Sequence, residues 1–139
     1  MQRFHTSSEE ETIALGQKLA AELTRPAVVL LIGNLGAGKT TLVKGLALGL
    51  GAAVPDEVTS PTFTLIHEYG SAVYHIDLYR LDTAREVASL GLDEIFDRED
   101  AVVLIEWGER FPELMPPDRI EIRIEGHEDQ REIVFSRNA

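Results

Sequence analysis

The chain of 139 residues has no cysteine, only three lysines, one tryptophan and no long apolar run. The absence of cysteine excludes disulfides, thiolate nucleophiles and cysteine-based zinc sites, and it fits a reducing compartment. Residues 1–11 lack the basic start and apolar core of a signal peptide, and no apolar stretch reaches the ~20 residues that cross a bilayer. We therefore expect a cytoplasmic protein with no membrane contact.

Basic residues are also scarce, with 13 Lys and Arg against 24 Asp and Glu and a net charge of -11. A protein that grips nucleic acid by neutralising phosphates usually has the opposite balance, so direct DNA binding is not expected. Residues 1–70 hold 5 basic and 7 acidic side chains, whereas residues 71–139 hold 8 and 17. An anionic ligand is therefore better tolerated by the first half.

Apolar residues make up 44% and charged residues 27% of the chain, the usual mix of a globular domain. Periodicity and capping signals predict helices over residues 8–23, 39–50 and 83–90, and buried strands over 27–32 and 101–105. They also predict a hairpin of residues 64–69 with 73–77. A strand with one solvent-exposed face is predicted over 119–125, paired with 131–135. The order predicts one α/β domain spanning residues 1–139, with a mixed, mostly parallel central sheet flanked by helices.

The segment Gly-Asn-Leu-Gly-Ala-Gly-Lys-Thr at residues 33–40 matches the Walker A pattern G-x-x-x-x-G-K-[ST] between a strand and a helix. In a P-loop NTPase the backbone amides of this loop and the helix N-terminus surround phosphates, the lysine reaches the β- and γ-phosphates, and the hydroxyl binds Mg²⁺. The sequence therefore predicts an ATP/ADP and Mg²⁺ site. The loop residues expected at the nucleotide are Gly33, Leu35, Gly36, Ala37, Gly38, Lys39, Thr40 and Thr41.

Two carboxylates end apolar strands, where a P-loop site needs an acid for the metal or its waters. These are Asp77 and Glu106; Asp77 has the alternative of a plain ion pair with Arg80. Thr62 lies in a Ser-Pro-Thr-Phe loop that suits either a γ-phosphate switch or an ordinary turn. The side chain of Trp107 is compatible with packing or with nucleotide contact, and His75 within its strand is expected to be structural.

The three lysines, Lys18, Lys39 and Lys44, leave no Asn-Lys-x-Asp guanine-reading pattern, so adenine is favoured. The region after Glu106 has no arginine-rich lid of the kind a kinase closes over its acceptor, which favours hydrolysis over transfer. Two alternatives stay open. One is a small-molecule kinase, and the other is a nucleotide-gated binding module in which ATP orders residues 60–63 to form a docking face.

Four blocks carry a family resemblance: GNLGAGKTT at 33–41, SPTFTL at 60–65, YHIDLYRL at 74–81 and IEW at 105–107. With these blocks the chain resembles the TsaE family, the P-loop ATPases of tRNA threonylcarbamoyladenosine biosynthesis. The resemblance implies a cytoplasmic ATPase, weak alone and stimulated by TsaB and TsaD, whose hydrolysis supports modification of the adenosine next to the anticodon. It implies contact with tRNA only indirectly, through the complex.

The resemblance also implies residue roles. Asp77, Glu106 and Thr62 would be catalytic, with Thr62 in the switch-like loop and Asp77 near the metal or the attacking water. Thr40 and Glu106 would ligate Mg²⁺, and Trp107 would lie close to the nucleotide. Ser8, Thr12 and Arg131 would flank the adenine and ribose.

Overall fold

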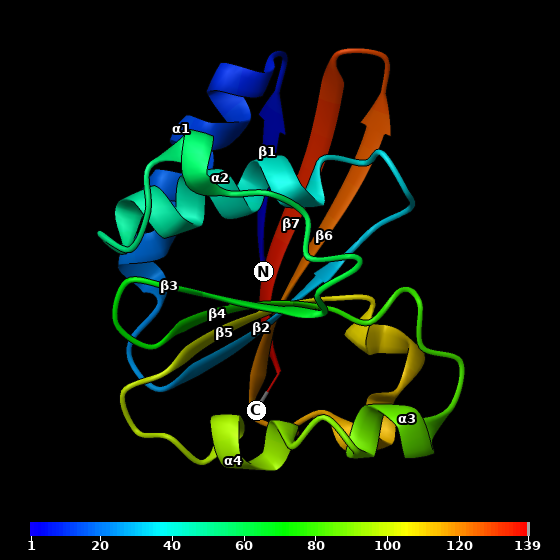
Figure 1. The fold of residues 1–139 in the computed structure, drawn as a ribbon. Helices are drawn as coiled ribbons and strands as arrows, with labels where there is room; N and C mark the ends of the chain where they lie inside the picture. Colours follow the sequence, from blue (N-terminus) through cyan, green and yellow to red (C-terminus); the bar gives the residue numbers. More distant parts are fainter. Residues whose placement is uncertain (139) are drawn as a thin grey trace.

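The computed structural model describes residues 1–138 and is organised around one seven-stranded sheet of order β1-β7-β6-β2-β5-β4-β3 (Figure 1). The four strands from β6 to β4 are parallel, and β1, β7 and β3 pair antiparallel at the two sides. The expected mixed α/β architecture is confirmed, with parallel pairing at the centre of the sheet. The strands are β1 (Gln2–Thr6), β2 (Ala27–Ile32), β3 (Ile66–Tyr69), β4 (Val73–Asp77), β5 (Val102–Glu106), β6 (Arg119–His127) and β7 (Gln130–Asn138).

Across the described residues 1–138, four α-helices and four short 3-10 turns connect the strands. The helices are α1 (Glu9–Leu19), α2 (Lys39–Gly49), α3 (Ala84–Ala88) and α4 (Leu92–Phe96). The turns are η1 (Ala20–Glu22), η2 (Pro55–Glu57), η3 (Gly108–Arg110) and η4 (Pro112–Leu114). None of these helices, within residues 1–138, has the length and apolar character needed to cross a bilayer.

Central strand β2 is buried on both faces, as its continuous apolar run predicts. Val29 and Leu31 belong to the cluster under α1 and α2, while Leu30 between them belongs to the cluster on the opposite face. All three side chains are at most 1% exposed. Because β2 is packed on both faces, its carboxyl end has a fixed position in the sheet, and so has the start of the loop that follows it.

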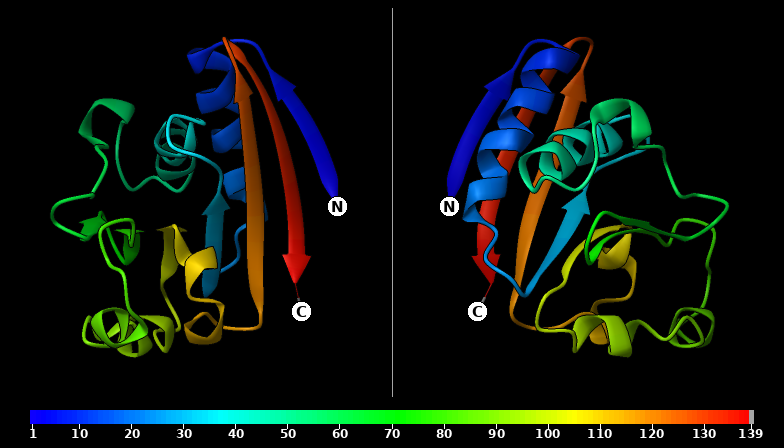
Figure 2. Two further views of the ribbon diagram at one scale, coloured as in Figure 1. Left: turned by 90° about the vertical axis from the view of Figure 1, so that its right-hand side faces the viewer. Right: turned by 60° about the vertical axis from the view of Figure 1, so that its left-hand side comes forward.

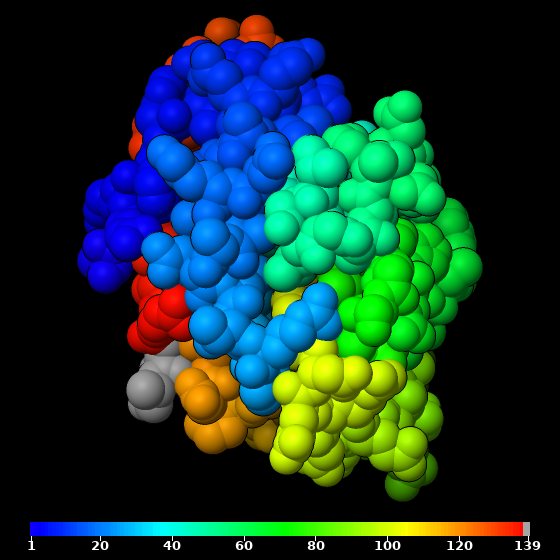
Figure 3. Space-filling view, turned by 90° about the vertical axis from the view of Figure 1, so that its left-hand side faces the viewer, coloured from blue at the N-terminus to red at the C-terminus, as the bar shows by residue number. Residues whose placement is uncertain are grey.

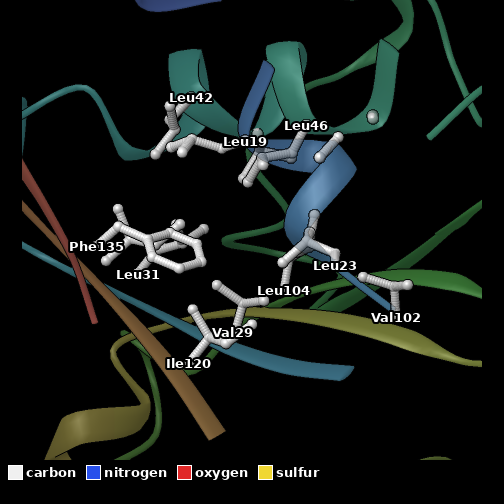
Figure 4. Close-up of a cluster of buried hydrophobic side chains, with 14 of the residues drawn as sticks. Leu19, Leu23, Val29, Leu31, Leu42, Leu46, Val102, Leu104, Ile120 and Phe135 are labelled. Atoms are coloured by element: carbon white, nitrogen blue, oxygen red, sulfur yellow. The ribbon is translucent and has the colours of Figure 1, made fainter. Parts of the chain in front are cut away.

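One face of the sheet is covered by α1 and α2, which lie side by side in the ribbon and space-filling views (Figures 2 and 3). Their close approach depends on glycine: a Cβ on Gly45 would lie 2.1 Å from the carbonyl oxygen of Ile13. Leu42 and Leu46 of α2 and Leu19 of α1 meet the sheet residues beneath them (Figure 4). This contact anchors the N-terminus of α2 above the carboxyl end of β2.

The opposite face is covered more thinly. Here α3 and α4, at the bottom of Figure 1, join η3 and η4 over Ile76, Val103 and Ile105. Strand β6 is covered on one face only. Ile120, Ile122 and Ile124 are buried in the cluster under α1 and α2, whereas Glu121 and Arg123 between them are not buried. The predicted strand with one wet face is therefore confirmed.

Several element boundaries differ from the sequence prediction. Strand β1 and helix α4 were not predicted, and the expected helix over 83–90 is helical only at Ala84–Ala88. At the start of α1 the Ser8 hydroxyl accepts from the Glu11 amide, but the Glu11 carboxylate accepts from Ser7 N rather than from Ser8 N. Ser8 therefore caps the helix, and Glu11 satisfies the amide one residue before the cap rather than that of the cap itself.

Candidate functional site

The glycine-rich loop, residues 33–38, joins the carboxyl end of β2 to the start of α2. Gly38, the N-cap of α2, has φ +107°, a backbone conformation that side chains with a Cβ rarely adopt. A Cβ there would also lie 3.3 Å from Nε of Arg131. Glycine at this position therefore sets the path by which backbone amides can surround an anion at the helix N-terminus.

Lys39 opens α2 and is only 4% exposed. Its Nζ donates to the carbonyl oxygen of Gly33 at 2.6 Å and lies 3.6 Å from the centre of the Trp107 ring. Burial lowers the pKa of Lys39, and the negative charges of Glu106, Glu109 and Asp77 oppose that shift. A polyanion bound at the loop would restore much of the stabilisation that the buried ammonium lost with its water.

Asp77 and Glu106 stand side by side because they are partners in the parallel β4–β5 register. They end their strands on the same edge of the sheet, at 3% and 4% exposure. The Thr40 hydroxyl donates to Oε2 of Glu106 at 3.3 Å, and Nε2 of His75 lies 2.5 Å from the same oxygen. The two strand-end acids and the helix hydroxyl expected from the sequence are thus in one place.

Asp77 is bonded to the loop over residues 60–63, hereafter the switch segment. Its Oδ2 accepts from the Thr62 hydroxyl at 2.9 Å and from Ser60 Oγ at 3.4 Å, while its Oδ1 accepts from the Tyr79 amide at 2.8 Å. Within residues 1–138 no ion pair joins Asp77 to Arg80, whose guanidinium lies over the Phe63 ring. The ion-pair interpretation of Asp77 is therefore wrong.

Trp107 lies next to Glu106 and has φ +68°, which turns its ring back over Lys39. The ring centre lies 5.2 Å from that of Tyr79, and the indole also packs against the buried cluster under η3. Trp107 is therefore a packing residue that also lines the cleft described below, and its contact with a nucleotide stays a prediction.

These groups line a cleft of about 400 Å³, a volume within the usual range of small-molecule sites. An adjoining hollow of about 200 Å³ lies between the N-terminus of α1 and the β6–β7 turn. Gly33 and Ala37 face a third hollow on the far side of the loop. The cleft is lined by Leu35, Gly36, Gly38, Lys39, Thr40, Thr41, Ser60, Thr62, Asp77, Tyr79, Glu106, Trp107 and Arg131.

The residues expected beside adenine and ribose line the adjoining hollow. Ser8 and Thr12 reach it from α1, and Arg131 from β7 borders both spaces. The Thr12 hydroxyl bonds to Thr6 Oγ1 and to the carbonyl of Ser8, and the residue is 2% exposed. Arg131 donates to the carbonyls of Glu128 and Gln130, and a Cβ on Gly126 would lie 2.9 Å from its Cζ.

Sequence reasoning missed two residues that line this cleft, Tyr79 and Ser60, and the contact of buried His75 with Glu106. The signal for His75 was available, because alternate residues of a strand share a face and His75 precedes Asp77 by two positions. Tyr79 and Ser60 had no such signal, since a loop side chain joins the site only once the chain has folded.

The arrangement suits a phosphate ester with a hydrated cation. Loop amides, the α2 N-terminus and Lys39 supply positive potential, and Thr40 with Glu106 supplies oxygen ligands. Among residues 1–138 no cluster of three His, Cys, Asp or Glu side chains could hold a metal ion alone. That donor set fits Mg²⁺, which usually takes one or two protein oxygens and completes its shell with phosphates and water.

Residues 6–133 match the family model described as Threonylcarbamoyl adenosine biosynthesis protein TsaE. The tRNA threonylcarbamoyladenosine biosynthesis protein TsaE of Bacillus subtilis (strain 168) is 44% identical over 139 residues, 96% of this chain and 84% of the relative. The protein of that name from Nostoc sp. is 45% identical over 118 residues, 81% and 71% of the two chains. The crystal structure of YdiB from Bacillus subtilis matches with a TM-score of 0.77 at 38% identity, covering 99% and 86%.

Proposed function

This chain belongs to the TsaE family, and from that premise we propose that it is a Mg²⁺-dependent ATPase acting in tRNA threonylcarbamoyladenosine biosynthesis. We assign residues 1–139 to one domain of the P-loop NTPase class. The relatives named above bear the name of that biosynthetic pathway. Because tRNA is the final substrate of such a pathway, we also propose a cytoplasmic location.

A single observation carries the ATPase assignment. The Walker A lysine and threonine, Lys39 and Thr40, converge with Asp77 and Glu106 in one cleft, although the acids lie 38 and 67 residues further along the chain than Lys39. An isolated glycine-rich turn would not need two buried carboxylates at neighbouring strand ends. The sequence motif and this convergence are independent arguments for one nucleotide site.

Each residue has a definable task in hydrolysis. Lys39 and the loop amides bind the phosphates and stabilise the negative charge that develops on them. Thr40 and Glu106 would hold Mg²⁺, which neutralises phosphate charge when bound. Asp77 accepts hydrogen bonds from Thr62 and Ser60, so it can orient the switch segment or the attacking water beside it. Trp107 and Tyr79 pack against each other and line one side of the cleft.

We propose that hydrolysis is weak in the isolated chain and is stimulated by the TsaB and TsaD proteins. Two apolar side chains near the cleft support a partner there: Phe63 of the switch segment is 81% exposed and Leu35 of the glycine-rich loop is 65% exposed. The net charge of -11 supports contact with tRNA only through those partners, because tRNA would be repelled by this surface.

The two alternatives are distinguished by the same residues. A small-molecule kinase needs positive groups to clamp a second substrate, and the cleft has only Arg131 besides Lys39 among its basic lining residues. A nucleotide-gated binding module is favoured by the Thr62–Asp77 bond, which ties the exposed Phe63 to the site. If Glu106→Gln and Asp77→Ala abolished hydrolysis but kept partner affinity and tRNA modification, gating would be the function.

The test is phosphate release from Mg²⁺·ATP by the purified chain, measured alone and with TsaB plus TsaD. We expect slow release alone, a marked increase with both partners, and dependence of reconstituted tRNA modification on this chain. An unchanged rate with partners would remove the tRNA-modification assignment. Transfer of the γ-phosphate to a metabolite in place of water would replace the ATPase with a kinase.

A further inference from the structure

Glu106 has a second hydrogen-bond partner that the proposed chemistry does not use. Nε2 of His75 lies 2.5 Å from Oε2 of Glu106, the same oxygen that accepts from Thr40. His75 is fully buried in β4, so water cannot replace this contact. An ionised carboxylate only accepts, so Nε2 carries the hydrogen and, in the neutral ring, Nδ1 is left as an acceptor.

The group that faces Nδ1 is the hydroxyl of Tyr69, at 3.5 Å, on the neighbouring strand β3. The phenol of Tyr69 is protonated at neutral pH and can donate, and burial raises its pKa further. The same hydroxyl lies 3.4 Å from the carbonyl oxygen of Thr59 and 3.2 Å from Nδ1 of His67. Tyr69 has one hydrogen to donate, so His75, the Thr59 carbonyl and, in one tautomer, Nδ1 of His67 compete for it.

This chain of contacts leads to both ends of the switch segment. Thr59 directly precedes residues 60–63, and the Thr64 hydroxyl that follows them lies 2.7 Å from Nε2 of His67. The hairpin of β3 and β4 that carries the three rings lies beside β5 (Figure 1). Asp77 contacts the middle of the switch segment directly. Glu106 connects to its two ends through the side chains of His75, Tyr69 and His67, hereafter the ring chain.

We infer that His75 and Tyr69 are positioning residues that couple the Glu106 carboxylate to the switch segment. The inference rests on the proposed function, since it assigns a regulatory connection to the same nucleotide site. A shift of Glu106 toward a bound cation changes the hydrogen bond that His75 can make, and Tyr69 then redistributes its hydrogen between His75 and the Thr59 carbonyl. The switch segment thereby responds to the occupancy of the metal position as well as to Asp77.

Two features of the chain make this coupling measurable without relying on turnover. Trp107 is the only tryptophan and lies over Lys39, so its fluorescence reports nucleotide binding. Phe63 is 81% exposed in the switch segment, so chymotrypsin cleavage after Phe63, identified by mass spectrometry, reports the order of that segment. Tyr69→Phe removes only the shared hydroxyl. Tyr74→Phe is the matched control, because the Tyr74 hydroxyl of the same hairpin bonds to Arg98, away from the cleft.

With Mg²⁺ and a non-hydrolysable ATP analogue, we expect the parent and Tyr74→Phe to be protected from cleavage after Phe63. Tyr69→Phe should lose about fivefold of that protection, the effect of one neutral hydrogen bond, and because binding and ordering are linked its Trp107 midpoint should rise by no more than that factor. In hydrolysis its kcat should fall by more than any rise in KM for ATP. His75→Gln is a second variant: it keeps a donor for Glu106 but places no acceptor at the position of Nδ1, so it should show the same uncoupling.

The outcomes separate the two proposals. If the parent shows no Trp107 response to any adenine nucleotide, the ATPase assignment fails and this inference fails with it. If nucleotides bind but Tyr69→Phe and His75→Gln are protected like Tyr74→Phe, the nucleotide site stands and the coupling is contradicted. If one of the two variants does not fold, the other decides the result in the same way.

Discussion

The Nζ atom of Lys39 lies 3.6 Å from the centre of the Trp107 ring. The carbonyl oxygen of Gly33 accepts from the same ammonium at 2.6 Å, so Lys39 is held between the loop that precedes it and an aromatic wall. A cation over an indole face is attracted by the ring quadrupole, most strongly where water is excluded. The lysine that the sequence motif marks is thus fixed in place by a residue 68 positions further along the chain.

Replacing Lys39 with Ala should weaken binding of Mg²⁺·ADP by about 10- to 100-fold, since charge-assisted hydrogen bonds contribute about 1.5–3 kcal/mol. Titration calorimetry measures the change. Lys44→Ala is the control: it removes a lysine from the same helix whose partner is Glu9, outside the main cleft. Equal affinities for the two variants would contradict the assigned role of Lys39.

Asp77→Asn should lower kcat for ATP by about 10² or more, the usual contribution of a group that moves or orients a proton in the reaction. The amide keeps the size of the side chain but cannot accept on both sides, so it disturbs the bonds to Thr62 or to the Tyr79 amide. Steady-state phosphate release measures the loss. Asp82→Asn, at an exposed position, should leave the rate unchanged; a similar loss there would argue against a specific role for Asp77.

Glu109 provides a test through pH. Its Oε1 is buried with no hydrogen-bond partner among residues 1–138, and burial raises the pKa of the carboxyl above 4.5. The folded state therefore binds the proton more tightly than the unfolded state, so stability falls as pH rises from 4.5 through the folded-state pKa. We expect Glu109→Gln to raise Tm at pH 7.5, with the gain shrinking as the pH approaches 4.5.

Thermal unfolding of parent and variant across that pH range checks the sign. Glu113→Gln, an exposed substitution on the neighbouring turn η4, is the control and should change Tm little at any pH. A Glu109→Gln variant that is less stable than the parent at pH 7.5 would mean that attraction to Lys39 and the nearby arginines outweighs the burial of the carboxylate.

Gly45→Ala should destabilise the fold by about 2 kcal/mol, because overpacking a tight contact costs about 1–3 kcal/mol. The added Cβ would lie 2.1 Å from the backbone oxygen of Ile13, so α1 and α2 would have to separate. The urea midpoint should drop at constant m. Gly51→Ala, with φ +70° and no atom within 4 Å of its Cβ, isolates the cost of the left-handed backbone alone, about 1 kcal/mol.

Most of the element order followed from local signals. The run over residues 27–32 predicted a doubly covered strand, and Leu30 and Leu31 are buried on opposite faces. Strand β1 escaped prediction because Phe4 is its one clearly apolar residue, and its pairing partner β7 lies more than 120 residues away. Helix α4 begins directly after Gly91, which the periodicity marked as the end of the preceding helix.

The site was predictable where chemistry is tied to a motif or to a strand end. Lys39, Thr40, Asp77 and Glu106 met those conditions, and they line one cleft. The contacts of Trp107 were not predictable, because its φ of +68° decides where the ring points. The ring chain from His75 to Tyr69 was likewise hidden, since hydrogen bonds across strands depend on register, which the sequence leaves open.

The most direct test of the central claim, a Mg²⁺·adenine-nucleotide site in this cleft, is calorimetric titration of the parent chain with ATP. The account predicts saturable binding of one ATP per chain with Mg²⁺, weaker binding in EDTA, and weaker binding of GTP. Absence of saturable binding by ATP and ADP, or binding that Lys39→Ala leaves unchanged, would contradict it.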